Sequence, residues 1–252
     1  MAEWRLVIDN GRSVYWNMAI DEALLLLREN SEIPNTLRLY YFKPSSITIG
    51  YFQRVVDAVN LEYVQKTGIP FTRRVTGGGS VYHDEKGEIT YSVVASLEDF
   101  PSDIIERYRA ICMGLVYAIE YLGLKAEFKP INDVVVNGKK VSGSAQTRKK
   151  HAFLQHGTLM YNTDLSIVAK ALKAPREKLR DHGVKSIRER VTTLSIELKH
   201  SIGRDEVLEA LIRGFEKALN THFYIEELSR KELELAEKLV DKYSSRGWIY
   251  RR

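Results

Sequence analysis

The sequence predicts an α+β protein with a mostly antiparallel or mixed sheet flanked by helices. Three observations support this fold class: strand-like apolar segments fill the centre of the chain, helical periodicity dominates both ends, and turn-forming residues separate the segments. The glycine run Gly77–Gly79 comes before a strand-like segment, whereas a dinucleotide-binding motif requires a helix at that point. A Rossmann fold is therefore disfavoured.

The N-terminal third alternates between strand and helix patterns. Pro44 and its neighbours are typical of a turn between two short apolar segments, and Gly68 ends the second helical segment. The predicted elements are a strand at 4–9, a helix at 14–28, strands at 37–42 and 46–51, and a helix at 57–67.

The rest of the chain begins rich in strands and ends in helices. Ser102 is a candidate N-cap for the clearest helix, and Asn137-Gly138 between two alternating segments is a strong hairpin signal. The predicted strands lie at 71–75, 80–83, 88–95, 133–136, 139–146 and 152–161, and the predicted helices at 102–122, 164–172, 204–220 and 229–242, with a short strand between the last two.

Composition and charge narrow the class of protein. The 252 residues are 44% hydrophobic and 28% charged, as in an ordinary globular protein, and the net charge is +5. This mild excess is compatible with an anionic ligand or an acidic partner, and a nucleic-acid-binding module is disfavoured. The longest aliphatic run, Leu24–Leu27, is far too short to span a bilayer. We expect a cytoplasmic protein without signal peptide, membrane segment or nucleic-acid partner.

The glycine loop and its flanks form the first candidate site. Three glycines expose backbone N–H groups to an anion, and Arg73 and Arg74 before the loop are donors suited to phosphate or carboxylate. His83 follows the loop. A flexible turn flanked by surface arginines is the alternative interpretation, which the combination of arginines and histidine makes less attractive.

The hairpin around Asn137-Gly138 forms the second candidate site. Alternation sends Lys139 and Lys140 to opposite faces, so one lysine points to whatever the sheet covers. Small residues at 142–145 leave room there for a ligand, and a buried ammonium group requires an anion. Asp133 is either a turn-forming aspartate or a magnesium ligand.

His156 and Cys112 are weaker candidates when each is taken alone. A histidine in an apolar strand is more often a hydrogen-bonded core residue than a catalyst. Cys112, the only cysteine, lies on the apolar stripe of the predicted helix 102–122, so we interpret it as an inert core thiol. A lone cysteine also excludes an internal disulfide framework and a multi-cysteine zinc site.

Together these segments resemble the lipoate–protein ligase family, within the wider biotin/lipoate ligase fold. The matching segments are IDEALL at 20–25, ITIGYFQ at 47–53, RRVTGGGSVYHD at 73–84, IND at 131–133, GKKVSGSA at 138–145, QHGTLMYNTDL at 155–165 and KSIRERVTTL at 185–194. The resemblance covers residues 4–195 and leaves a helical part at 204–242. It implies one catalytic domain over 1–252 without the accessory domain that many relatives carry.

The resemblance implies two-step chemistry with ATP and Mg²⁺. The lipoate carboxylate attacks the α-phosphate of ATP to give lipoyl-AMP, and a lysine of an acceptor domain then takes the lipoyl group. Lys140 would lie between carboxylate and phosphate as the catalytic residue. The implied phosphate contacts are Arg74, Gly79, Ser80, Val81, Tyr82, Asn132 and Asp133, with Asp133 also the candidate magnesium ligand. The implied lipoate contacts are Gly77, Gly78, His83, Lys140 and His156.

The resemblance also implies partners and rivals. Acceptors would be lipoyl domains of 2-oxoacid dehydrogenase E2 subunits or the glycine-cleavage H protein, and a separate accessory subunit would assist activation. Octanoyltransferases of the same fold use a cysteine just before the region of Asn132, where residues 126–133 contain none. An octanoyl or lipoyl transferase and a non-catalytic lipoate-binding protein remain the alternatives, and a biotin ligase is disfavoured because its nucleotide loop differs.

Overall fold

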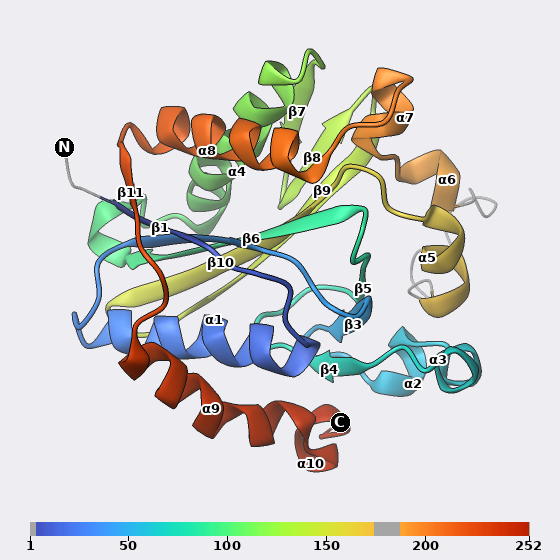
Figure 1. Ribbon diagram of the computed structural model, residues 1–252, viewed down its shortest axis with the longest axis horizontal. Helices are drawn as coiled ribbons and strands as arrows, with labels where there is room; N and C mark the ends of the chain where they lie inside the picture. Colours follow the sequence, from blue (N-terminus) through green and yellow to red (C-terminus); the bar gives the residue numbers. More distant parts are fainter. Residues whose placement is uncertain (1–3, 174–186, 252) are drawn as a thin grey trace.

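The computed structural model describes residues 4–173 and 187–251, and its strands form two sheets (Figure 1). The strands are β1 Trp4–Ile8, β2 Thr36–Tyr40, β3 Ser46–Ile49, β4 Phe71–Arg73, β5 Val81–His83, β6 Glu88–Ser96, β7 Ala126–Lys129, β8 Asp133–Val136, β9 Lys139–Arg148, β10 Ala152–Met160 and β11 Phe223–Ile225. The helices are α1 Val14–Glu29, α2 Val55–Ala58, α3 Leu61–Thr67, α4 Ile104–Tyr121, α5 Leu165–Ala171, α6 Ile187–Arg190, α7 Leu194–Leu198, α8 Arg204–Leu219, α9 Arg230–Ser244 and α10 Arg246–Ile249, with a 3₁₀ turn at Leu97–Asp99.

The large sheet has eight strands in the order β11-β1-β2-β6-β10-β9-β8-β7. The β11, β1 and β2 strands pair in parallel, and every pairing from β2 to β7 is antiparallel. The predicted mixed sheet flanked by helices is therefore confirmed.

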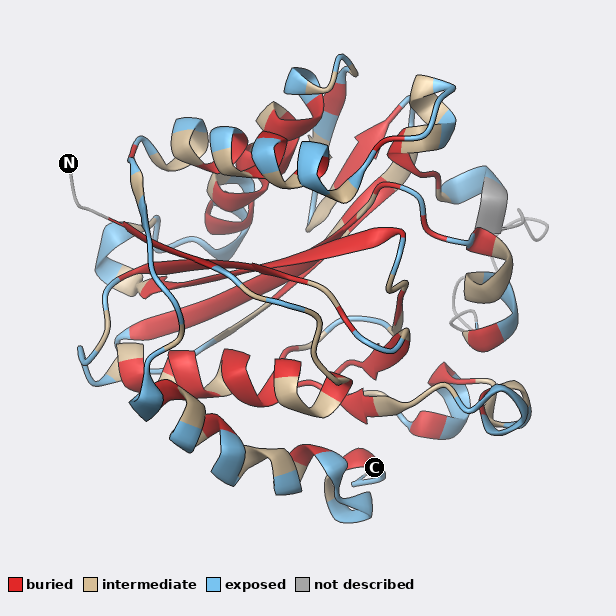
Figure 2. Ribbon diagram, viewed as in Figure 1, coloured by how far each residue is buried: buried red, intermediate tan, exposed pale blue. Residues whose placement is uncertain are grey.

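Helices cover both faces of this sheet (Figure 1). The α4 and α8 helices pack on one face, where an apolar cluster includes Ile111, Leu115 and Phe215. The α1 and α9 helices lie on the other face, over a second cluster that includes Leu24 and Leu154. Figure 2 shows the long central strands buried and the outer sides of α8 and α9 exposed, so the sheet is the middle layer of three.

A small sheet in the order β4-β3-β5 lies beside the large one and carries the glycine loop between β4 and β5. It packs with α2, α3 and α5 around a third apolar cluster that includes Ile47, Ile49 and Val59. The loop is thus held between two short strands rather than at the start of a helix.

Three details of the sequence prediction are wrong. The segment 57–67 contains two helices, because Val59 is extended and Asn60 caps α3 by accepting a hydrogen bond from the Tyr63 N–H. The α4 helix is capped by Asp103 and not by Ser102, since the Asp103 carboxylate accepts from two backbone N–H groups. The edge strand β7 and the short helices α6, α7 and α10 were not predicted from the sequence.

The predicted hairpin between β8 and β9 is confirmed. Asn137 and Gly138 have φ of 50° and 75°, as a two-residue turn of this type requires. Among the helices of the described ranges, none is both long and apolar enough to cross a membrane.

Candidate active site

Lys140 shares one face of β9 with Gly143 and Ala145. The register between β8 and β9 shifts between Val134 and Val135, and this bulge resets the alternation along β9. A Cβ atom at Gly143 would collide with the Lys140 Nζ and Cε atoms, so the lysine side chain lies directly over that glycine. The predicted placement of a lysine beside small residues is confirmed for Lys140.

Asp133 holds the ammonium group of Lys140. The Oδ1 atom of Asp133 lies 2.6 Å from Lys140 Nζ, and the two side chains are 33% and 37% exposed. Asn132 anchors this end of β8, because its side-chain amide donates to the Ser144 carbonyl and its own carbonyl accepts from the Ser144 N–H at 2.9 Å. The pair therefore sits at a fixed and accessible place on the sheet.

The segment that includes Thr192 reaches Lys140 from another part of the chain. Thr192 N–H donates to the Lys140 carbonyl at 2.9 Å, and Val191 bridges Lys140 in parallel. Val191 and Thr192 of the matching segment KSIRERVTTL thus lie beside the lysine, whereas Lys185 and Ser186 fall outside the described residues.

Arg74 is buried beneath the glycine loop. Its Nη2 group donates to the carbonyls of Gly77 and Gly79, at 2.5 and 2.7 Å. Its Nε donates to Thr76 at 2.9 Å, and Nη1 lies 3.3 Å from the Thr48 hydroxyl oxygen. Burial lowers the pKa of the guanidinium to about 10. Arg74 thus shapes the loop from inside.

Arg73 does not face the loop. Its guanidinium donates to backbone carbonyls of α10 and of residues 50–53, including Ile249 at 2.7 Å and Tyr51 at 2.8 Å. The Trp248 indole in return donates to the Arg73 carbonyl at 2.7 Å. The expectation that both arginines serve the loop is therefore wrong for Arg73, which fastens the C-terminal helix.

The exposed part of the glycine loop is its backbone at Gly78 and Gly79. Gly78 has φ of 88°, and a Cβ atom there would lie 3.9 Å from the Ala145 Cβ, so the loop rests on the same face of β9 as Lys140. A Cβ atom on Gly50 would collide with the Gly78 carbonyl, which explains the glycine in the segment ITIGYFQ.

The residues that follow the loop, 80–82, attach it to the small sheet and to α2. Val81 and Tyr82 pair with β3 in the small sheet. Tyr82 is buried in the third apolar cluster, and the Ser80 hydroxyl donates to the Ala58 carbonyl at 3.2 Å. These side chains anchor the loop, and within the described chain none of them is hydrogen-bonded to Lys140.

His156 and His83 lie on two sides of Arg74. His156 Nδ1 lies 2.8 Å from Asp21 Oδ2 and its Nε2 lies 2.7 Å from the Thr76 hydroxyl. His83 Nδ1 lies 2.9 Å from Glu88 Oε1 and its Nε2 lies 2.9 Å from the Thr48 hydroxyl, with the ring stacked on Phe42. Both ring nitrogens of each histidine are therefore engaged by the protein.

Charged groups stabilise this arrangement. Burial opposes ionisation of Asp21, but the hydrogen bond from His156 and the charge of Arg38 outweigh it, so the pKa of Asp21 is lowered. Burial also lowers the pKa of His156, despite the neighbouring Asp21. The imidazole is thus neutral near pH 7 and donates from Nδ1 to an ionised Asp21.

Cys112 lies on the opposite side of the sheet, on the buried side of α4. Its Sγ atom is 3.5 Å from the Ser144 hydroxyl and 3.7 Å from Gln155 Nε2, and Tyr91 bonds the same serine. Burial raises the pKa of the thiol to about 11. The prediction that Cys112 is a buried core residue is confirmed, and its inertness stays a prediction.

The donor set near Lys140 fits magnesium only in company with a substrate. Within residues 4–173 and 187–251 no group of three or more His, Cys, Asp or Glu side chains could hold a metal ion. Mg²⁺ in phosphate-transfer sites is commonly held by one or two carboxylates together with substrate phosphates, and Asp133 could supply one such carboxylate.

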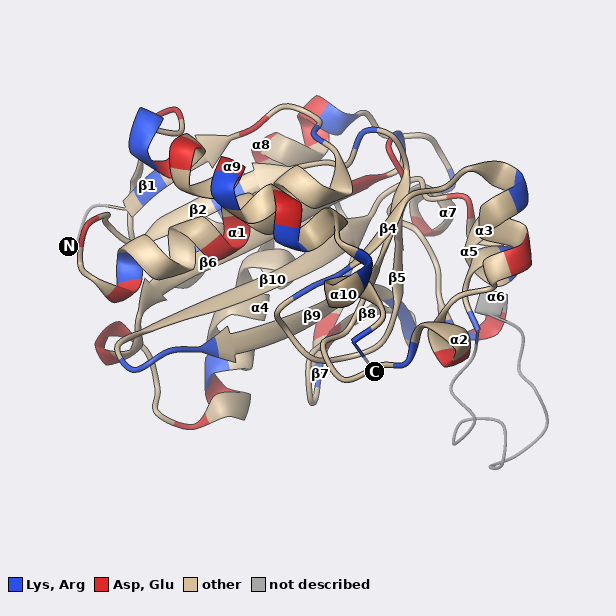
Figure 3. Ribbon diagram, turned by 90° about the horizontal axis from the view of Figure 1, so that it is seen from below, with Lys and Arg blue, Asp and Glu red and all other residues tan. Residues whose placement is uncertain are grey.

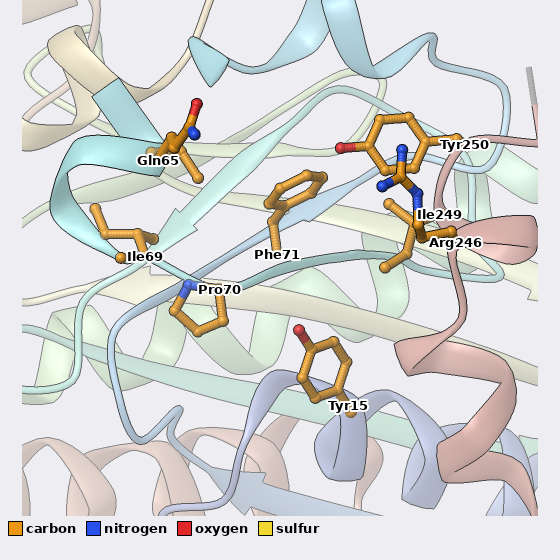
Figure 4. Close-up of a pocket in the computed structure, with 10 residues that line it drawn as sticks. Tyr15, Gln65, Ile69, Pro70, Phe71, Arg246, Ile249 and Tyr250 are labelled. Atoms are coloured by element: carbon orange, nitrogen blue, oxygen red, sulfur yellow. The ribbon is translucent and has the colours of Figure 1, made fainter. Parts of the chain in front are cut away.

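Two surface features lie apart from this site. A hollow of about 310 Å³ between α3, β4 and α10 is lined by Tyr15, Phe71, Arg246 and Tyr250 among others, and contains none of the predicted site residues (Figure 4). The turn that follows Arg148 is exposed, and Glu29 accepts from its backbone N–H groups. Figure 3 shows acidic and basic segments interspersed over the helices.

Sequence reasoning missed the roles of Asp21, Thr48, Thr76 and Gly50. The first, second and fourth lie in IDEALL and ITIGYFQ, which matched the family without a role assigned to any residue. The helical pattern of residues 14–28 predicts that Asp21 faces outward, and this prediction is wrong, because Asp21 is 1% exposed in the middle of α1. Such a residue requires a buried partner.

Comparisons with known proteins agree on one family. The model of the lipoyl protein ligase A/B catalytic domain matches residues 13–216. The chain is 35% identical to octanoyltransferase LipM of Brevibacillus brevis over the full length of both chains. It is 37% identical to lipoate-protein ligase A subunit 1 of Thermoplasma acidophilum, covering 96% of this chain and 94% of that one.

Solved structures give the same result. The bi-partite lipoate protein ligase of Thermoplasma acidophilum, described with its E2 lipoyl domain, superposes with a TM-score of 0.86 at 36% identity over 99% of this chain and 97% of that one. A lipoate-protein ligase A bound with ATP superposes at 0.83, with 33% identity and 99% and 98% coverage. A putative lipoate protein ligase of T. acidophilum with bound lipoic acid superposes at 0.82, with 32% identity and 98% and 99% coverage.

Proposed function

The chain belongs to the lipoyl protein ligase A/B catalytic domain family, and we propose that it is the catalytic chain of an ATP-dependent lipoate–protein ligase. Its relatives are named as octanoyltransferases and lipoate ligases, so the comparisons support an enzyme of lipoyl or octanoyl transfer on this fold. The choice between the two reactions rests on the placement of chemical groups in this chain.

One observation carries the choice: the loop face of β9 presents a lysine, and the only cysteine lies beneath the opposite face. Lys140 is 37% exposed, whereas Cys112 is fully buried and the pKa of its thiol is about 11. A transferase that holds its acyl group as a thioester requires an accessible thiolate. A ligase that forms an acyl-adenylate requires a fixed cation and no protein nucleophile.

In the proposed reaction Lys140 lies between two anions. The carboxylate of lipoate attacks the α-phosphate of ATP, the bond from that phosphorus to the pyrophosphate oxygen breaks, and pyrophosphate leaves. The ammonium group reduces the repulsion between carboxylate and phosphate and stabilises the charge of the transition state. Asp133 keeps the ammonium group in place over Gly143.

The glycine loop would hold the anionic groups on its backbone. Gly78 and Gly79 are exposed, and Arg74 beneath them adds a positive charge that no carboxylate of the described residues neutralises within 4 Å. When bound, Mg²⁺ would supply neutralisation of the leaving pyrophosphate, with Asp133 and the phosphates as its ligands. The acceptor lysine then attacks the lipoyl carbonyl and AMP leaves.

The partner proposal follows from the Thermoplasma relative. That ligase is described as bi-partite, together with its E2 lipoyl domain. We propose that this chain likewise takes lipoyl domains as acceptors and works with a separate accessory chain in the adenylation step, with the H protein as a second class of acceptor. Lipoate and ATP, which occur in the neighbouring structures, are the proposed substrates.

The test is the mass shift of an apo E2 lipoyl domain incubated with the purified chain, lipoate, ATP and Mg²⁺. Parallel reactions add a candidate accessory chain, replace lipoate and ATP by synthetic lipoyl-AMP, or supply an octanoyl thioester instead. We expect lipoylation with lipoyl-AMP, and with lipoate and ATP once the accessory chain is present. Transfer from the octanoyl thioester alone would establish a transferase, and binding of lipoate without any transfer would establish a binding protein.

A further inference from the structure

Arg74 is a buried cation without a direct anionic partner. All five N–H groups of its guanidinium have oxygen acceptors, yet every acceptor is a hydroxyl or a carbonyl from the loop or from β3. Among the described residues no carboxylate lies within 4 Å of it, in contrast to Arg38, which binds Asp9 and Asp21. A buried charge of this kind is costly unless more distant groups compensate it.

Two similar arms connect Arg74 to buried carboxylates. In the first arm Arg74 Nε donates to Thr76, whose hydroxyl lies 2.7 Å from His156, and His156 lies 2.8 Å from Asp21. In the second arm, Arg74 Nη1 faces the Thr48 hydroxyl, which lies 2.9 Å from His83, and His83 lies 2.9 Å from Glu88. The order arginine, threonine, histidine and carboxylate is the same in both.

The donors of the first arm have one consistent direction. Asp21 is ionised and accepts from His156 Nδ1, which leaves the Nε2 atom of a neutral imidazole as an acceptor. The Thr76 hydroxyl therefore donates to His156, and its oxygen accepts from Arg74. Every polar atom in the arm then has a partner, and the carboxylate orients the arginine at a distance of two side chains.

We propose that Asp21 and Glu88 are positioning residues for the glycine loop, acting through His156–Thr76 and His83–Thr48 to hold Arg74 against the carbonyls of Gly77 and Gly79. This inference rests on the proposed function only in assigning ligand binding to the loop. Neither carboxylate touches the substrate. Their effect is to fix the loop conformation in which its backbone faces the ligand.

Replacement by the corresponding amide is expected to affect the two carboxylates differently. Asp21 accepts from His156 and Tyr40 on Oδ2 and from Arg38 on Oδ1, so an asparagine amide meets a donor whichever way it turns. Glu88 accepts from His83 and Thr90 on Oε1, while Oε2 is buried without a partner in the described chain. In Glu88→Gln the amide oxygen can take the place of Oε1, and the amide nitrogen the place of Oε2. Asp21→Asn is therefore expected to disturb the loop far more than Glu88→Gln.

The test combines amide hydrogen exchange of the loop peptide with steady-state kinetics. Thr76→Val breaks the first arm without touching Arg38, and Thr76→Ser retains the hydroxyl and should rescue it. Asp9→Asn is the matched control, because Asp9 binds the same Arg38 at 2.7 Å and, within the described chain, is hydrogen-bonded to neither histidine. All variants are measured in the full chain, with lipoyl-AMP as the probe.

For Asp21→Asn and Thr76→Val we expect loop exchange to rise on the order of tenfold and the KM for lipoyl-AMP to rise by a similar factor, with kcat less affected. Thr76→Ser and Asp9→Asn should stay close to the wild type, and the effect of Glu88→Gln should lie between theirs and that of Asp21→Asn. The double variant of Asp21→Asn with Thr76→Val should be no worse than either single one, because both break one arm.

The proposal would be overturned if Thr76→Val showed the same loop exchange and the same KM as the wild type. It would also be overturned if Asp21→Asn lowered kcat alone, because a smaller folded fraction lowers kcat without changing KM. An equal KM change in Asp9→Asn would also overturn it. Should the wild type transfer nothing from lipoyl-AMP, the proposed function fails, and the exchange data still decide the positioning role.

Discussion

The two faces of β9 and β10 both carry buried polar residues, yet they differ in charge. The loop face holds Lys140 and His156, and it is linked to the buried Arg74 and Asp21. The opposite face packs against α4, and neutral groups there, including Cys112 of that helix, are hydrogen-bonded to one another. Arg107 of α4 adds one buried cation to that side, where it donates to Gln146 at 2.9 Å. The loop side differs because it combines cations with carboxylates where an anionic ligand can meet the loop.

This difference assigns different tasks to the two faces. A neutral hydrogen-bonded cluster can be fully buried because its polar atoms satisfy each other. A cation such as Lys140 can bind an anion only where its ammonium group is partly exposed and held in a fixed position. Glycine at 157 leaves room for the neutral cluster, because a Cβ atom there would lie 2.7 Å from the Ser144 hydroxyl and 2.8 Å from the Tyr91 ring.

The largest effect is expected for Lys140→Met. Removing the ammonium group leaves carboxylate and α-phosphate to repel each other, so formation of lipoyl-AMP should fall by about 10²–10³-fold. The measurement is pyrophosphate release in the complete reaction with ATP, lipoate, Mg²⁺ and the accessory chain. Folding should persist because the side chain is 37% exposed.

Lys139→Met is the control for this prediction. Lys139 pairs with Val136 next to the turn, before the register shift in the hairpin, and it is likewise only half-buried. Its removal should change the rate less than twofold by the reasoning that exposed charges contribute little. Equal rates in the two variants would remove the basis for placing the chemistry at Lys140.

Gly143→Ala tests the same position without removing the charge. The added methyl group overlaps the present place of the Lys140 ammonium group and lies 3.4 Å from Asp133 Oδ1, so the lysine must move. A displacement of about 1 Å can reduce a rate on the order of 10²-fold. We expect a loss of ten- to a hundredfold in adenylation, while Gly203→Ala, which adds its methyl group in open space, should be neutral. Unchanged adenylation would mean that the lysine position is not critical.

These positions also show how far sequence reasoning reaches. Local signals predicted the hairpin turn at Asn137-Gly138 and the lysine beside small residues, because both features depend on residues that are neighbours in the sequence. The partners of His156 could not be predicted, since Asp21 and Thr76 come from α1 and the glycine loop, far away in the chain. The bulge that turns Lys140 toward Gly143 depends on pairing between strands and leaves no local pattern.

The pH dependence of stability reports on the protonation state of His156 on the loop face. Burial lowers the pKa of His156, so between that pKa and about 6.5 the unfolded chain takes up a proton at this residue that the folded chain does not. His156 therefore lowers the free energy of unfolding as pH falls below about 6.5, by at most about 1.4 kcal/mol per pH unit. The lowered pKa of Asp21 acts only nearer its unfolded value of about 3.9.

Urea unfolding of the wild type and of His156→Gln at pH 7.5 and 5.5 measures this effect. The variant should be less stable at pH 7.5, because Asp21 and Thr76 lose a buried partner, and the difference between the two proteins should narrow at pH 5.5. A difference that grows toward acid pH would show that His156 is protonated in the folded protein. That result would reverse the donor direction assigned to the first arm.

The smallest effect on activity is expected for Cys112→Ser, which probes the neutral face. With a thiol pKa of about 11, roughly one thiol in 10⁴ is ionised at pH 7, too few for a nucleophile. Serine can keep the contacts with Ser144 and Gln155, so lipoyl transfer from lipoyl-AMP should stay within about twofold of the wild type. The matching measurement is intact mass after incubation with an octanoyl thioester, where we expect no acyl group on the wild-type protein. An adduct that the serine variant lacks would identify Cys112 as the acylated residue. The chain would then act as a transferase, as its relatives named octanoyltransferase LipM do by name, and not as a ligase.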